Sequence, residues 1–198
     1  MHTYEARKFD IPKLEGISEE SIKQYLGLYE GYVKNFNAIS KQIAELAMSD
    51  SGKYAHAISE LVRRRSFEFD GMRLHEHYFE QFEGGLTALT TGGALAKALE
   101  SAYAPMTAEK VMTMIGSMRG PGWAILYFDP HAKELLTGFS GEQHQGHFVT
   151  LPILLALDVW EHAFILDYGA LGKGKYIDAF FKNLNWGVVE KRFARASA

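Results

Sequence analysis

The N-terminal part of the chain has apolar residues at the spacing of an amphipathic helix. Ser18, followed by Glu19 and Glu20, has the N-cap and the acidic first turn that are typical of a helix start. The apolar positions that follow, at steps of three and four residues, are Ile22, Leu26, Tyr29, Val33, Phe36, Ile39, Ile43 and Leu46. This pattern predicts one long helix.

Two further helices are predicted in the next stretch. Residues 53–65 have the pattern of a second, shorter helix. Residues 72–82 have the pattern of a third helix, which stops at Gly84 and Gly85.

Glycine pairs divide the chain into two predicted domains. The pairs at residues 84–85 and 92–93 lie in a segment without strong periodicity. We therefore expect a helical domain over residues 1–88 and a mixed domain over residues 89–198.

The periodicity changes within the C-terminal domain. Helices are predicted at residues 95–103 and 107–118, three strands at 123–128, 134–139 and 148–155, and further helices near 161–168, 176–183 and 186–194. Helices first, and then an antiparallel meander between later helices, predict an α+β fold.

Composition narrows the classes of partner and of site. The 198 residues include no cysteine, so any metal must take nitrogen and oxygen ligands, as Fe, Mn and Zn do.

The net charge of −3 argues against nucleic acid as a partner, although Arg63, Arg64 and Arg65 form a local basic run. No apolar stretch reaches the roughly 20 residues of a membrane span, and the polar N-terminus has no signal-peptide core. These features predict a cytoplasmic protein that binds neither nucleic acid nor membrane.

A carboxylate and an imidazole follow the apolar run of residues 151–157. Asp158 and His162 are four residues apart and can converge on one cation, and Trp160 between them can help to exclude bulk water. We interpret this pair as half of a metal site.

The same segment resembles the iron/manganese superoxide dismutase family. Residues 158–163 read D-V-W-E-H-A, a pattern of the family's C-terminal half, and residues 69–79 resemble the family's second-helix pattern N-H-x-x-F. Further matches occur in order at residues 17–18, 32–37, 120–123, 166–168 and 185–186. The resemblance implies a long N-terminal helical hairpin packed on a C-terminal unit with a three-stranded antiparallel sheet. It also implies a homodimer that converts superoxide to dioxygen and hydrogen peroxide.

The resemblance implies one Fe or Mn ion per chain, held by three residues of this sequence. His77 is the ligand expected from the hairpin, and Asp158 and His162 are those expected from the C-terminal unit. His75 is two residues from His77 and is expected to point elsewhere, as a structural or surface residue.

The resemblance implies roles at the site for five further residues. Tyr32 is expected to line substrate access, and Gln143 to hydrogen-bond metal-bound solvent. Trp123 and Trp160 are expected to form aromatic walls, and Glu161 to reach across the dimer to the partner's ligand His.

The sequence departs from the family at the fourth ligand, a His in the first helix. Two alternative registers place Gln24 or Tyr25 at that position, and Tyr25 also fits an aromatic packing stripe. Glu142 and His144, in the segment of Gln143, are alternative donors. The fourth ligand is therefore open among these four residues.

Three hypotheses for function follow. The first is a superoxide dismutase with Fe or Mn. The second is a non-haem iron protein with other redox or oxygenase chemistry, since two His and one Asp are a ligand set of such enzymes and Ile165 replaces a gateway Tyr of the family. The third is a non-catalytic interaction module on the same scaffold.

Overall fold

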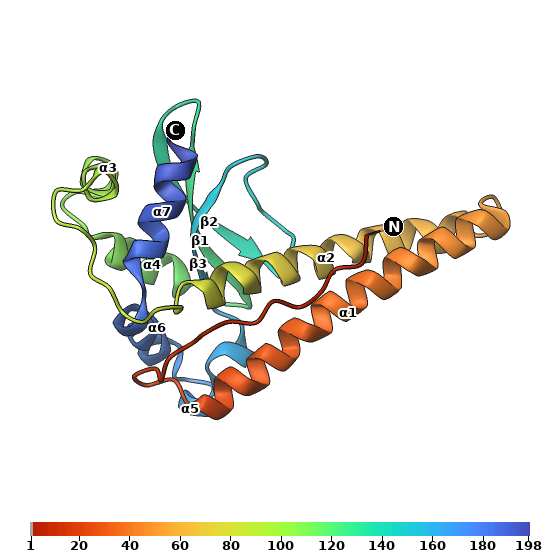
Figure 1. Ribbon diagram of the computed structural model, residues 1–198, viewed down its shortest axis with the longest axis horizontal. Coiled ribbons are helices and arrows are strands. Elements are labelled where there is room, and N and C mark those ends of the chain that lie inside the picture. Colours follow the sequence, from red (N-terminus) through yellow and green to blue (C-terminus); the bar gives the residue numbers. More distant parts are fainter. Residues whose placement is uncertain (1) are drawn as a thin grey trace.

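A long helical hairpin forms the N-terminal half of the molecule. The computed structural model describes residues 2–198, in which α1 (Glu19–Asp50) and α2 (Ala55–Glu80) lie side by side and project away from the rest of the chain (Figure 1). The backbone N–H of Ser21 donates to the Ser18 side chain at 3.0 Å, so the predicted N-cap of α1 is confirmed.

The second helix is continuous, whereas the sequence pattern predicted two helices here. No break separates residues 65 and 72, because α2 passes through Gly71 in regular helical conformation. A Cβ atom at Gly71 would lie 2.6 Å from Cδ1 of Tyr32 on α1. The glycine therefore allows the two helices to approach closely and does not end the helix.

A three-stranded antiparallel sheet lies at the centre of the C-terminal unit, as predicted. Its strands β1 (Gly122–Asp129), β2 (Glu134–Gly141) and β3 (Ile153–Asp158) have the order β2-β1-β3. The central strand β1 is buried from Gly122 to Phe128, as expected for a strand that is covered on both faces. The α+β fold class is therefore confirmed.

The third strand begins later than the sequence predicted. Residues 148–152 form a loop, in which Thr150 has a φ of 68° and Pro152 has no N–H to donate. The strand then continues to Asp158, whose Cα pairs with that of Trp123 on β1. The carboxylate of Asp158 consequently stands at the end of a buried strand.

Helices complete the C-terminal unit. They are α3 (Ala94–Tyr103), α4 (Ala108–Gly116), a short 3-10 turn η1 (Glu161–Ala163), α5 (Ile165–Tyr168), α6 (Lys173–Asn183) and α7 (Trp186–Ala196). The backbone N–H of Lys110 donates to the Thr107 hydroxyl, which confirms the predicted cap of α4. Among residues 2–198, no helix combines the length and the apolar character needed to cross a membrane.

The hairpin and the sheet are joined by buried polar contacts. The side-chain amide of Gln81, just after α2, donates to the Ala156 carbonyl and accepts from the Ala156 N–H, each at 2.8 Å. These bonds hold the end of α2 against β3, and so set the hairpin beside Asp158. The division at residue 88 into two domains stays a prediction.

Candidate metal centre

Asp158 is the centre of a cluster of buried donors. Its side chain is fully buried, and its Oδ1 accepts the backbone N–H of Trp160 at 2.7 Å. Its Oδ2 faces Nε2 of His162 at 3.2 Å and also contacts the hydroxyl of Tyr25. One carboxylate oxygen is thus held by the backbone while the other points toward an imidazole and a phenol.

His75 presents an unpartnered nitrogen in the same place. The ring is fully buried, and its Nδ1 lies 2.6 Å from the carbonyl oxygen of Gly71, one turn earlier on α2. A carbonyl can only accept, so Nδ1 carries the proton and Nε2 keeps its lone pair. That Nε2 has no hydrogen-bond partner. Burial lowers the pKa of His75 to about 4, so the imidazole is neutral at pH 7.

These three residues fit a metal ion. One ligand atom each from His75, Asp158 and His162 lie within 4.8 Å of one another. Metal-bound histidines commonly donate their second ring N–H to a carbonyl, as His75 does to Gly71. An orphaned imidazole nitrogen beside a buried carboxylate is the arrangement that a cation would complete. The side chain of His162 is 25% exposed, so solvent can reach this side of the cluster.

The structure does not bring the predicted ligand His77 into the cluster, which contains His75 instead. Successive helical residues are about 100° apart, so His77 lies about 200° around α2 from His75. Its carbonyl accepts from Arg192 on α7 at 2.9 Å, and burial together with Arg192 lowers the pKa of its ring to about 4.

Helical spacing gives a signal for His75. One series of buried positions on α2 and its C-terminal extension recurs at steps of three and four residues and includes His75, although Met72, Leu74 and Glu76 are buried as well. The series is Gly71, His75, Tyr78, Phe79 and Phe82. His77 is not in that series, and the expectation that His75 is a structural or surface residue is corrected by its place beside Asp158.

An ordered hydrogen-bonded chain borders the cluster. The indole N–H of Trp123 donates to Oε1 of Gln143 at 2.9 Å, and Nε2 of Gln143 donates to the hydroxyl of Tyr32 at 3.0 Å. Trp123 and Gln143 are both fully buried. The rings of Trp123 and Tyr32 lie 5.3 Å and 4.9 Å from that of His75. The structure thus places these three predicted site residues next to the cluster.

Trp160 and Glu161 lie on the outer side of the cluster. The Trp160 ring stacks on His162, with centroids 5.7 Å apart and planes at 20°. Glu161 is exposed. Trp160 therefore covers a face of His162, while Glu161 is free to meet another molecule.

Of the four candidates for a further ligand, one reaches the cluster. Tyr25 is 2% exposed, and its hydroxyl contacts Oδ2 of Asp158. Burial, and secondly the charge of Asp158, raise the pKa of Tyr25 well above its usual value. Gln24 is exposed and donates to Glu20 on its own helix.

The other two candidates lie outside the donor cluster. His144 faces Glu142, with Nδ1 and Oε2 3.9 Å apart, and packs its ring against Phe67. Neither belongs to the group of close ligand atoms formed by His75, Asp158 and His162.

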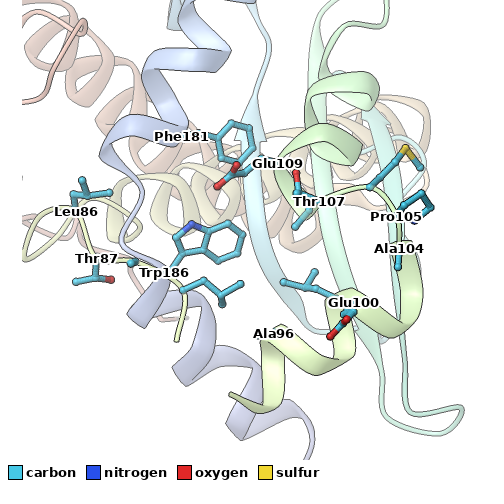
Figure 2. Close-up of a pocket in the computed structure, with 15 residues that line it drawn as sticks. Leu86, Thr87, Ala96, Glu100, Ala104, Pro105, Thr107, Glu109, Phe181 and Trp186 are labelled. Atoms are coloured by element: carbon cyan, nitrogen blue, oxygen red, sulfur yellow. The ribbon is translucent and has the colours of Figure 1, made fainter. Parts of the chain in front are cut away.

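A separate cavity of about 610 Å³ lies between α3, α4 and the start of α7. Figure 2 shows Trp186 on one of its sides and the connection from Ala104 to Thr107 on another. Its lining carries the carboxylates of Glu100 and Glu109 but no imidazole. This cavity therefore lacks the donor set of the Asp158 cluster.

Comparison with known proteins identifies the family. Residues 91–192 match the C-terminal domain of the iron/manganese superoxide dismutases. The superoxide dismutase [Fe] of Aquifex pyrophilus is 35% identical over 196 residues, which cover 92% of this chain and 87% of that protein. The chain belongs to the iron/manganese superoxide dismutase family.

Relatives in this dismutase family carry names for both metals. The superoxide dismutase [Fe] of Saccharolobus solfataricus is 29% identical over 96% of this chain and 95% of its own length. The superoxide dismutase [Mn] 2 of Haloferax volcanii is 28% identical over 85% of this chain and 82% of its own length. The family match includes Asp158 and His162, whereas His75 and Tyr25 precede it on the hairpin.

Proposed function

We propose that this protein is a superoxide dismutase with one Fe or Mn ion per chain, held by His75, Asp158 and His162. The observation that carries the proposal is the convergence of two imidazoles and a buried carboxylate, in a chain of this family, where α2 meets the end of β3. The overall reaction takes two superoxide anions and two protons to one dioxygen and one hydrogen peroxide. A bound Fe or Mn ion would supply one-electron redox chemistry.

The three residues suit an ion that changes its charge by one. Asp158 contributes one negative charge, and the two imidazoles bind without adding any. The hydrogen bonds from Trp160 N–H to Asp158 and from His75 to the Gly71 carbonyl keep the donors in place. Such fixed donors would need little rearrangement between the two oxidation states.

Gln143 and Tyr32 are placed to orient solvent and protons. Since Trp123 fixes Oε1 of Gln143 as an acceptor, the amide N–H groups point toward Tyr32. Burial, and then the charge of Asp158, raise the pKa of Tyr32 above its ordinary value, so its phenol stays protonated at pH 7. We assign this pair to positioning solvent at the site, and Trp123 and Trp160 to excluding bulk water.

The proposal includes a homodimer in which Glu161 meets the partner's ligand histidine. Its support is that Glu161 is exposed next to His162, in a family motif. A twofold interface would bring each Glu161 to the other protomer's site. A cytoplasmic location stays a prediction.

One preparation tests the reaction, the metal and the assembly. The chain is loaded separately with Fe and with Mn, and metal per chain, superoxide consumption and mass in solution are measured. We expect about one ion per chain, catalytic loss of superoxide and the mass of a dimer. Metal binding without superoxide consumption favours the non-haem iron alternative. The exposed Ile165, which stands where the family has its gateway Tyr, is compatible with that alternative. A chain that takes up neither metal contradicts the proposal.

A further inference from the structure

We propose that Tyr25 supplies a phenolate oxygen to the metal as a fourth protein ligand, and that the complete site holds ferric iron. This inference rests on the proposed metal site at His75, Asp158 and His162, and it adds an oxygen donor where the family has a histidine.

The position of the Tyr25 ring carries the argument. Its centroid lies 5.0 Å from the ring of His75 and 5.0 Å from that of His162. Its hydroxyl contacts Oδ2 of Asp158, the carboxylate oxygen that also faces His162. The phenol oxygen therefore lies at the carboxylate oxygen that faces His162, and the Tyr25 ring lies beside both imidazole rings.

The neighbouring tyrosines direct their hydroxyls elsewhere. Tyr78 packs against Tyr25, with centroids 5.0 Å apart, but its hydroxyl accepts from that of Tyr176 at 3.1 Å. The Tyr32 hydroxyl accepts from Gln143. Tyr25 is thus distinguished from two tyrosines that share its surroundings, and both serve as matched controls.

A buried phenol bound only to a carboxylate is the simpler role for Tyr25. That role leaves Nε2 of His75 without a partner, in contact with the same group of rings. An ion among these atoms would satisfy that nitrogen, the carboxylate and the phenol together. On coordination, the O–H bond of Tyr25 would break, its proton would pass to solvent, and the phenolate oxygen would bind the ion.

The charge balance favours ferric iron. Asp158 and a phenolate together bring two negative charges to a largely buried site, and hard anionic oxygens suit a trivalent ion. Tyrosine also ligates iron in catalase haem, so the donor itself is suited to iron. Ferric phenolates absorb visible light by charge transfer from the ring to the metal, which gives a readout independent of activity.

Absorption and resonance Raman spectra of the iron-loaded full-length chain test the inference. We expect a visible charge-transfer band whose Raman spectrum shows phenolate ring modes that shift when the protein is made with ring-deuterated tyrosine. Tyr25→Phe should lose the band and these modes, while Tyr78→Phe and Tyr32→Phe should retain both. Iron per chain is measured in every sample.

The outcomes separate this inference from the proposed function. Wild-type protein with about one iron per chain and no phenolate modes overturns Tyr25 ligation and leaves the three-residue site intact. A band that persists in iron-loaded Tyr25→Phe also overturns it. Wild-type protein that binds no iron overturns the metal site itself. Because Tyr25→Phe also removes a donor to the iron, the isotope shift in the wild type is needed to show that a tyrosine is bound. Its persistence in Tyr78→Phe and Tyr32→Phe then excludes these two neighbours as the ligand.

Discussion

At the scale of single residues, the rotation of a helix decides which imidazole can bind a metal. His75 and His77 have the same chemistry and are two positions apart, yet only His75 joins Asp158 and His162. Each ring has one buried nitrogen without a hydrogen-bond partner, but His75 lies beside Asp158 and His162, whereas the backbone carbonyl of His77 accepts from Arg192 of α7. We therefore expect the loss of His75, but not the loss of His77, to lower the affinity of the protein for metal.

We expect His75→Ala to abolish stoichiometric metal binding and His77→Ala to retain it. Loss of groups outside the coordination sphere weakens metal binding about 10- to 100-fold, so loss of a ligand should weaken it by more than about 100-fold. Competition with a chelator, with metal per chain measured on the folded variants, checks this. Full metal occupancy in His75→Ala, at the affinity of the wild type, would contradict the assignment.

At the scale of helices, the close approach of α1 and α2 connects the packing of the hairpin to the site. Tyr32 fills the space over Gly71, and its hydroxyl reaches Gln143 from that position. Anything that displaces the Tyr32 ring therefore also disturbs Gln143, which lies in the loop between β2 and β3.

We expect Gly71→Ala to lower superoxide consumption severalfold while metal is retained. Alanine gains about 1 kcal/mol in helix propensity, but the clash with Tyr32 costs about 1 to 3 kcal/mol, so stability should stay level or fall by up to about 2 kcal/mol. Denaturant unfolding and steady-state kinetics measure the two effects. Gly27→Ala on α1 is the control, since its added Cβ meets no atom within 4 Å and should stabilise the helix. Unchanged kinetics in Gly71→Ala would argue against a role for Tyr32.

At the scale of the whole molecule, the site exists only where the two halves meet. Tyr25 and His75 come from the hairpin, and Asp158 and His162 come from the C-terminal unit. An ion-pair network reinforces the junction, because Glu80 at the end of α2 binds Arg192 of α7 at 2.6 Å. Arg7 of the N-terminal segment binds the other oxygen of Glu80 at 3.2 Å.

This network predicts a pH-dependent contribution to stability. Burial would raise the pKa of Glu80, but hydrogen bonds and charges from Arg192 and Arg7 outweigh it and lower the pKa below its usual 4.5. A carboxyl whose pKa is lower in the folded state stabilises the fold above about pH 4.5, and this contribution is lost as the pH falls through the folded-state value.

We therefore expect Glu80→Gln to reduce the free energy of unfolding at pH 7 by about 1 to 3 kcal/mol. The difference from the wild type should shrink as the pH falls below about 4.5, as measured by denaturant unfolding of the metal-free chains at several pH values. Glu60→Gln removes an exposed pair with Arg63 and should change stability by less than about 1 kcal/mol. An equal difference at pH 7 and at pH 3 would contradict this account.

Much of the fold could be predicted because its signals are local. The cap at Ser18, the cap at Thr107 and the strand pattern of β1 depend on neighbouring residues, and the structure confirms them. The continuity of α2 could not be predicted, because Gly71 makes room for the ring of Tyr32 and does not end the helix. Tyr32 is distant in sequence, so no local pattern shows this contact. The start of β3 was misplaced because an apolar run shows that a segment is buried but not where it pairs.

The sequence alone determined the family resemblance, the α+β fold class and the pair of donors at Asp158 and His162, which are close along the chain. Only the tertiary structure decided that His75 joins them in place of His77, and that Tyr25 reaches the same carboxylate. The physical reason is that a side chain on a helix points where the packing of the whole helix turns it. Two residues along α2 reverse its direction, and the face that meets β3 is set by contacts between distant segments.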